Sequence, residues 1–244
     1  MNLVIDIGNS RAKVALFSSR KMIACFFYDE LTVVELYGLM KKHPEINNAI
    51  FSSVAAADPS LVEWLKQSCS FFLTLDYRTP MPIHNNYLTP QTLGLDRLAA
   101  AIGAQELFPA RDLLVIDAGT AVTLDLVERN GTFAGGNISP GLTSRFRALH
   151  EFTRNLPLLK EEEDIPLIGR STEEAIKAGV IYGMTLEIDG MIDLLKKKYN
   201  ELQPVLTGGD APFFERRLKN PIFVKSEITL IGLNRILEYN VEKQ

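Results

Sequence analysis

The chain begins with apolar stretches separated by a short polar turn, which is the pattern of a β-hairpin. Residues 2–7 and 12–17 are apolar runs of strand length on either side of the turn 8–11, and 23–28 is a third run of the same kind. The first run contains a carboxylate near its end, Asp6. A buried carboxylate costs several kcal/mol unless something satisfies it. The stretch is therefore predicted to be either a structural hairpin or a site.

Helical and strand patterns alternate through the rest of the chain. Ser171 and Glu174 form a capping-box pattern at the start of a long apolar-periodic segment. The proline-rich segment 77–93 is predicted to be an irregular loop, and the glycine-rich segment 131–142 a turn-forming stretch. We expect helices near 31–42, 60–69, 94–107, 171–200 and 228–240, strands at 47–54, 71–75, 114–118 and 123–127, and a strand, glycine turn and helix over 203–218.

One apolar motif occurs twice. The sequence LVIDIG at 3–8 returns as LVIDAG at 114–119, and each copy is followed by a polar turn and a further apolar strand. A repeat of this kind predicts two lobes built alike by internal duplication, 1–112 and 113–244. Chance similarity between two apolar strands is the alternative.

Composition narrows the class of protein. The 244 residues are 46% hydrophobic and 23% charged, as in a globular protein, and no apolar stretch approaches the roughly 20 residues that span a bilayer. The net charge of −4 argues against a broad nucleic-acid interface. The N-terminal sequence lacks the basic and apolar regions of a signal peptide. We therefore expect a cytoplasmic protein without nucleic-acid or membrane partners.

Both copies of the repeat carry residues suited to a metal nucleotide. Asp6 and Asp117 each begin a glycine turn, at 6–11 and 117–120. Backbone N–H groups in such turns can bind phosphate oxygens, and a carboxylate at the end of a strand can hold hydrated Mg²⁺. The chain has no GxxxxGK[ST] loop, no GxGxxG after a strand and no GxSxG elbow. P-loop, Rossmann and α/β-hydrolase sites are therefore not supported.

Five motifs in this order resemble the type III pantothenate kinases over nearly the whole chain: DIGNSR, LGLDRLAA, IDAGTAVTLD, GGNISPGL and TGGD. The resemblance implies an α/β fold of two ribonuclease-H-like lobes, as in the actin, sugar-kinase and Hsp70-like superfamily, with mixed sheets flanked by helices. It also implies ATP-dependent phosphorylation of pantothenate to 4′-phosphopantothenate, the first step of coenzyme A biosynthesis. The enzyme would be a homodimer that needs Mg²⁺ and a monovalent cation, K⁺ or NH₄⁺.

The resemblance assigns roles to individual residues. Asp96 is the expected general base, and Leu95 beside it stands where the family more often has alanine, so its side chain either trims the pocket or points into the core. Asp117 is expected to bind the monovalent cation, and Asp6 to hold Mg²⁺ through water. Substrate contacts are expected at Tyr87, Gly94, Leu95, Asp96, Arg97 and Thr172, and ATP contacts at Asp6, Ile7, Gly8, Asn9, Ser10, Arg11, Ala12, Lys13 and Thr120.

Other interpretations stay open. Another kinase or a phosphoanhydride hydrolase of the same fold is one alternative, and a non-catalytic nucleotide-binding regulator is another. Taken alone, Asp96 would also suit an ordinary helix N-terminus. An apolar stripe with a spacing of four is either a dimer interface or a face toward the core. Its members are Ile176, Val180, Met184 and Ile188.

Overall fold

A computed structural model describes residues 1–8, 11–53 and 58–243, which form two compact units. Unit 1 comprises Met1–Leu107 and Glu227–Gln244, and unit 2 comprises Phe108–Ser226. The predicted division assigned residues 227–244 to the second lobe, whereas in the structure this segment belongs to unit 1. It belongs to unit 1 because its helix, α7 (Ile228–Val241), packs against α3 (Leu95–Leu107).

A mixed five-stranded sheet forms the centre of unit 1, in the order β3-β2-β1-β4-β5. Strand β1 runs antiparallel to β2 and parallel to β4, so the predicted hairpin and third strand are confirmed. The strands are β1 (Asn2–Ile7), β2 (Ala12–Ser18), β3 (Lys21–Tyr28), β4 (Asn48–Ser53) and β5 (Phe71–Thr74). The loop predicted over 77–93 contains only the short strand β6 (His84–Asn85) and the 3₁₀ turn η1 (Pro90–Thr92).

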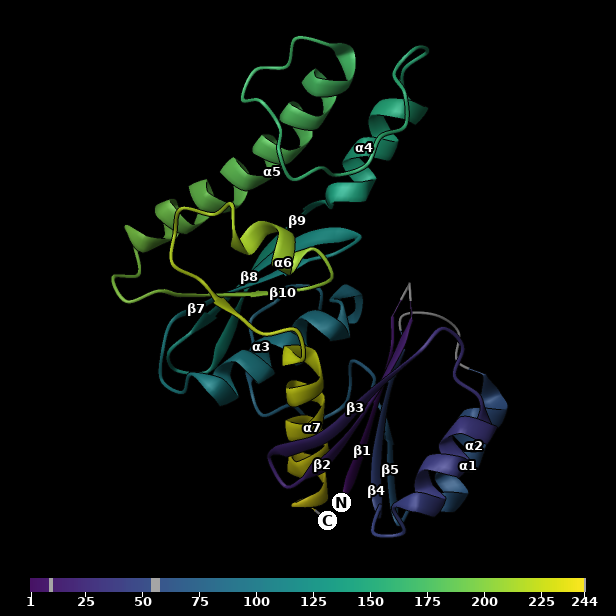
Figure 1. Ribbon diagram of the computed structural model, residues 1–244. Coiled ribbons are helices and arrows are strands. Elements are labelled where there is room, and N and C mark those ends of the chain that lie inside the picture. Colours follow the sequence, from purple (N-terminus) through teal and green to yellow (C-terminus); the bar gives the residue numbers. More distant parts are fainter. Residues whose placement is uncertain (9–10, 54–57, 244) are drawn as a thin grey trace. The chain divides into compact units, whose positions relative to one another are not determined.

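Helices cover both faces of this sheet (Figure 1). On one face α1 (Val33–Lys42) and α2 (Pro59–Ser68) cover Leu3 and Ile5, and on the other α3 and α7 cover Val4. Since side chains alternate along a strand, Asp6 shares the face of Val4. The α3–α7 face of the sheet therefore carries the first candidate carboxylate.

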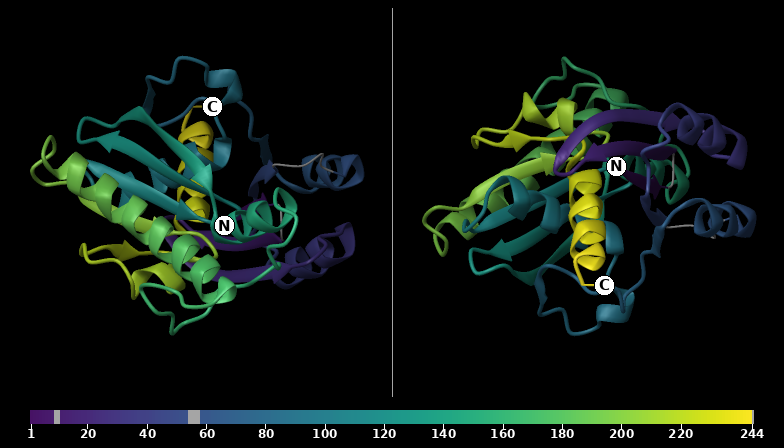
Figure 2. Two further views of the ribbon diagram at one scale, coloured as in Figure 1. Left: turned by 90° about the horizontal axis from the view of Figure 1, so that it is seen from above. Right: turned by 90° about the horizontal axis from the view of Figure 1, so that it is seen from below.

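Two glycines let α3 and α7 approach closely (Figure 2). A Cβ atom on Gly103 of α3 would lie 2.0 Å from the carbonyl oxygen of Ile228, and one on Gly232 of α7 would lie 1.7 Å from that of Ala99. Neither distance is compatible with a side chain, so the two backbones are in direct contact. This contact fixes α3, whose first turn carries Asp96, relative to the rest of unit 1.

Unit 2 has a second mixed sheet, with strands in the order β11-β10-β7-β8-β9. The long helix α5 and helices α4 and α6 contribute to its main hydrophobic core, together with β7, β8 and β10. The elements are β7 (Leu113–Ala118), β8 (Ala121–Glu128), β9 (Thr132–Pro140), α4 (Leu142–Glu151), α5 (Thr172–Lys196), β10 (Gln203–Thr207), α6 (Ala211–Glu215) and β11 (Phe223–Val224). Within the described parts of the chain, no helix is long and apolar enough to cross a membrane.

The glycine-rich segment after the second motif is mainly a strand, not the predicted turn. Strand β9 pairs antiparallel with β8 along nearly its whole length. Gly135 has a φ of 118°, and a Cβ on Gly136 would lie 2.3 Å from the carbonyl oxygen of Leu124. The glycines therefore allow β9 to follow an irregular course and to approach β8 closely.

The apolar stripe on α5 faces the core of unit 2. Ile176, Val180, Met184 and Ile188 are all at most 7% exposed and pack in the cluster that includes β7 and β8. Of the two interpretations of this stripe, the structure therefore supports the face toward the core, because its side chains are already buried within one chain. Ser171 caps α5 as predicted by accepting from the Glu174 N–H, but the Glu174 carboxylate accepts from the Arg170 N–H.

Candidate active site

Three polar side chains lie on the α3–α7 face at one end of the unit 1 sheet. Asp6 stands opposite Lys13 in the antiparallel β1–β2 pairing and beside Ser52 in the parallel β1–β4 pairing. Residues paired in this way share a face of the sheet. Ser52 also forms a side-chain hydrogen bond with the Asp6 carboxylate. The strand ends thus bring together a carboxylate, an ammonium group and a hydroxyl.

The Asp6 carboxylate is held in an environment that disfavours its charge. It is 8% exposed, and this burial is the main cause that raises its pKa to about 6. Lys13 lowers the pKa, Asp96 raises it by repulsion, and the Ser52 hydrogen bond lowers it. The repulsion shows that the carboxylates of Asp6 and Asp96 lie within electrostatic reach of one another. A cation placed beside them would relieve both the burial cost and the repulsion.

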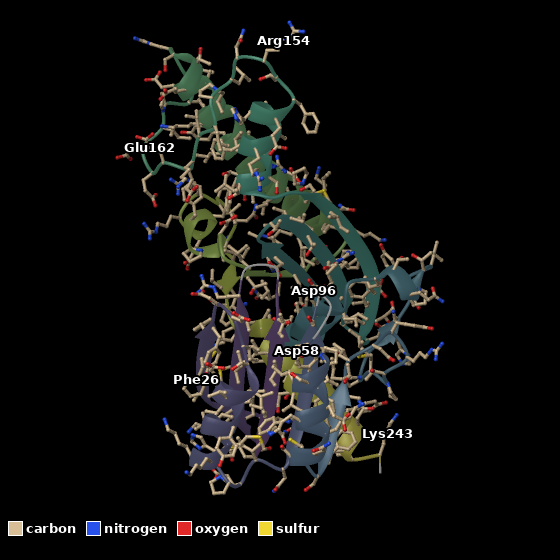
Figure 3. All side chains as sticks on the ribbon, turned by 90° about the vertical axis from the view of Figure 1, so that its right-hand side faces the viewer. Phe26, Asp58, Asp96, Arg154, Glu162 and Lys243 are labelled. Carbon is tan, nitrogen blue, oxygen red and sulfur yellow. The ribbon has the colours of Figure 1, made fainter. Side chains whose placement is uncertain are left out.

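Asp96 lies in the first turn of α3 and is labelled in Figure 3. Its Oδ1 accepts a hydrogen bond of 2.9 Å from the Arg97 N–H. A Cβ atom on Gly94 would lie 2.5 Å from the same oxygen. The absence of a side chain at Gly94 therefore leaves room for the Asp96 carboxylate in this orientation.

The two residues that flank Asp96 make different contacts. The Arg97 guanidinium lies over the Tyr87 ring, 5.7 Å from its centroid, so two expected substrate contacts are brought together. Arg97 is buried, with 7% exposure. The Leu95 side chain packs against the core cluster that contains Val4 and Ala99. Of the two interpretations of Leu95, the structure supports the one in which the side chain points into the core.

The first glycine turn is described in part. The Gly8 N–H donates to the Arg11 carbonyl over 3.2 Å, which closes the turn. Ile7 and Ala12 pack with the core on the α1–α2 face, so only their backbone is available to a phosphate. The Arg11 guanidinium lies 5.6 Å from the centroid of the Phe27 ring. Asn9 and Ser10, both expected ATP contacts, lie outside the described residues.

Asp117 occupies the corresponding strand position in unit 2. It pairs in register with Thr123 of β8 and Thr207 of β10, on the face opposite the α5 core. Gly208 has a φ of 97°, and a Cβ there would lie 2.5 Å from the Asp117 Oδ1. The glycine of the TGGD motif thus gives the Asp117 carboxylate its space, and the surroundings are rich in oxygen atoms.

Thr120 and Thr172 are both exposed. Thr120 follows the Gly119 turn, in which the Gly119 N–H donates to the Ala121 carbonyl over 3.0 Å. Thr172 is the first residue of α5. Each side chain is therefore accessible within unit 2, as a ligand contact requires.

The candidate cation sites use few protein ligands. Among the described residues, no group of three or more His, Cys, Asp or Glu side chains could hold a metal ion. Mg²⁺ commonly keeps several waters and binds one or two carboxylates together with substrate phosphates. Asp6, buried and close to a second carboxylate, fits that kind of site.

Ser52 is a site residue that the sequence analysis missed. It is buried, with 5% exposure, and its hydroxyl contacts the Asp6 carboxylate. A signal was present, because a polar pair, Ser52 and Ser53, interrupts the apolar run near the end of the predicted strand 47–54. Its importance depended on the parallel β1–β4 pairing, which joins residues far apart in the sequence.

Comparisons with known proteins agree with this geometry. The sequence profile of the family described as type III pantothenate kinase matches residues 2–194. A Phocaeicola vulgatus protein named type III pantothenate kinase is 45% identical over 240 residues, which cover 98% of this chain and 99% of that protein.

Two solved structures show the same fold. A Campylobacter jejuni protein described as a candidate Baf-family transcriptional activator has a TM-score of 0.61 at 23% identity, covering 98% of this chain and 99% of that one. A glucokinase from an Antarctic psychrotroph has a TM-score of 0.54 at 12% identity, covering 98% of both chains. At these identities the likeness concerns the fold alone. It confirms the predicted fold class, an α/β fold with mixed sheets flanked by helices.

Proposed function

This chain belongs to the type III pantothenate kinase family, and we propose that it phosphorylates pantothenate with Asp96 as the general base. The reaction moves the terminal phosphoryl group of ATP to the pantothenate hydroxyl, giving 4′-phosphopantothenate and ADP. The observation that carries the proposed mechanism is the pair formed by Asp96, at the first turn of α3, and the buried Asp6 beside it. One carboxylate is positioned to accept a proton and the other to hold a cation.

Asp96 takes the hydroxyl proton as the new oxygen–phosphorus bond forms. Phosphoryl transfer depends mainly on positioning and charge stabilisation, so the base needs the right place more than a raised pKa. Gly94 leaves space for the carboxylate, and the Arg97 N–H holds one of its oxygens. The Arg97 guanidinium, stacked on Tyr87, places a positive charge near the base. This charge suits the carboxylate of pantothenate.

Asp6 is the residue that would hold Mg²⁺, in the main through water. The ion supplies charge neutralisation for the phosphates during transfer. Lys13 adds a positive charge on the same face of the sheet, and the Ser52 hydrogen bond fixes the Asp6 carboxylate. The turn that begins at Gly8 is the segment that we expect to contact the phosphates.

Asp117 is the residue that would bind the monovalent cation. Its carboxylate and the hydroxyls of Thr123 and Thr207 form an oxygen-rich environment that suits K⁺ or NH₄⁺. Thr120 is exposed and lies in the turn that follows β7. It is the expected ATP contact in this unit.

Assembly as a homodimer remains part of the proposal, without the α5 stripe as its interface. Thr172, exposed at the start of α5, is the residue that we expect to complete a substrate site in the assembled enzyme.

A reaction that consumes ATP and supplies a coenzyme precursor also fits the expected cytoplasmic location.

The test is phosphorylation by the purified full chain. Pantothenate, ATP and Mg²⁺ are supplied in K⁺ or Na⁺ buffer of equal ionic strength, and phosphopantothenate is measured directly by mass spectrometry. Direct detection avoids coupling enzymes, so the cation exchange acts on this protein alone. We expect product in K⁺ and markedly less in Na⁺, with a mass in solution of twice the chain.

Each alternative gives a different result in the same assay. Phosphorylation of a sugar or another acid with none of pantothenate would indicate another kinase of this fold. Phosphate release without an acceptor would indicate a hydrolase, and ATP binding without turnover would indicate a regulator.

A further inference from the structure

The end of strand β9 lies beside the second glycine turn. The β8–β9 pairing ends with Ala121 opposite Pro140, so the next residue of the chain reaches the turn itself. The Gly141 N–H donates to the Thr120 carbonyl over 3.1 Å, and the Ser144 hydroxyl donates to the same oxygen over 2.7 Å. We call Gly141 and Ser144 the clasp.

Gly141 fits the turn only because it has no side chain. A Cβ atom there would lie 1.9 Å from the Gly119 carbonyl oxygen and 2.7 Å from that of Thr120. The clasp therefore lies against two successive carbonyl groups. In a planar trans peptide the N–H points opposite to the C=O. With the Gly119 carbonyl directed at Gly141, the Thr120 N–H is directed away from the clasp.

This orientation matters for an anion. A turn binds phosphate through N–H groups, whereas a flipped peptide would present a carbonyl oxygen and repel it. The clasp opposes such a flip because both carbonyls are already in contact with Gly141 or bonded to it. The exposed Thr120 side chain is oriented by the same restraint.

The clasp is anchored from behind by an ion pair. Arg145 Nε donates to the Pro140 carbonyl over 2.7 Å, and the Arg145 guanidinium pairs with Glu187 of α5. The Ser139 hydroxyl also donates to Glu187. The turn between β9 and α4 is thus tied to the long helix of unit 2.

We propose that Gly141 and Ser144 are positioning residues for the nucleotide, holding the Gly119–Thr120 turn in its phosphate-binding orientation. The inference rests on the proposed function, since it takes this turn as an ATP contact. It also assigns a role to the GGNISPGL motif, for which the proposed reaction has no direct use.

The test compares Ser144→Ala with a matched variant, Thr153→Ala. Like Ser144, Thr153 donates over 2.7 Å to a backbone carbonyl, that of Leu149, but it lies just past the other end of α4. Ser144→Ala should raise the KM for ATP by about threefold to tenfold, the effect of one lost hydrogen bond, while the KM for pantothenate and the Tm stay unchanged. Ser144→Thr keeps the hydroxyl and should restore the KM, and Thr153→Ala should change neither KM.

Gly141→Ala should raise the KM for ATP further, and Gly190→Ala is its control because a Cβ on Gly190 meets open space. The inference is overturned if Ser144→Ala leaves the KM for ATP within twofold of wild type, or if both KM values and the Tm change together. If wild type does not phosphorylate pantothenate, the proposed function has failed. Calorimetric binding of a non-hydrolysable ATP analogue then tests the clasp separately, with the same weakening expected for Ser144→Ala.

Discussion

Replacing Asp6 with asparagine should change how the stability of the ligand-free protein depends on pH. The pKa of Asp6 rises from 3.8 to about 6 mainly through burial. The folded protein therefore holds this proton more tightly than the unfolded chain does. The stability that this group contributes is present below about pH 4, and is lost as the pH rises through about 6.

The size of the effect follows from the shift. A change of about two pKa units corresponds to about 3 kcal/mol in total, of which about 1.4 kcal/mol falls between pH 5 and pH 8. Because asparagine does not titrate, Asp6→Asn should abolish this part of the pH dependence. Asparagine can still accept the hydrogen bond from Ser52, so the sheet should remain intact.

The measurement is urea unfolding at pH 5 and pH 8, in chelator and without nucleotide. The free energy of unfolding of wild type should fall by about 1.4 kcal/mol more than that of Asp6→Asn over this interval. Asp58→Asn is the control, because Asp58 is an exposed cap of α2 that accepts from the Ser60 N–H, and asparagine caps as well as aspartate (Figure 3). Equal pH dependence in wild type and Asp6→Asn would refute the reasoning that burial holds this carboxyl at a raised pKa.

Three further predictions concern the base, the cation and the helix contact. Asp96→Asn should lower kcat by roughly 10² to 10⁴-fold with little change in Tm or ATP binding. The control is Glu35→Gln, which removes a first-turn charge from α1 and should leave kcat unchanged. A rate above about a tenth of wild type in Asp96→Asn would exclude Asp96 as the base. Asp117→Asn should reduce the preference for K⁺ over Na⁺ in initial-rate measurements, and an unaltered preference would remove Asp117 from the cation site. Gly232→Ala should lower the Tm by about 6 °C or more, because its Cβ would lie 1.7 Å from the Ala99 carbonyl oxygen, and an unchanged Tm in calorimetry would contradict the tight α3–α7 contact.

Local patterns predicted most of the secondary structure. The hairpin around residues 8–11 and the long helix after Ser171 follow from apolar period and capping, and both are confirmed. The segment 131–142 was mispredicted because its glycines suit a turn as well as a closely packed strand, and only the pairing with β8 distinguishes the two. The pattern alone left two interpretations of the α5 stripe open for a related reason, because a helical apolar period shows that a face is buried but not what buries it.

The candidate site was less accessible to sequence reasoning. Asp6 and Asp96 were found through motifs, but their mutual repulsion depends on a strand end and a helix start that tertiary packing brings together. Ser52 was missed as a partner of Asp6, and Gly141 as a partner of the second glycine turn, because each contact depends on strand pairing, of β1 with β4 and of β8 with β9. The roles of the predicted site residues remain predictions.

Helix α7 has a consequence for how the protein is made. A ribosome synthesises residues 108–226, the whole of unit 2, before the segment that completes unit 1. Unit 2 is one continuous segment, whereas residues 1–107 lack the α7 residues that cover Val4 of β1 and Ala99 of α3 until the last segment is made. During that interval the nascent chain exposes apolar surface, which makes it prone to aggregation. Premature termination before α7 would leave this surface uncovered in the released chain.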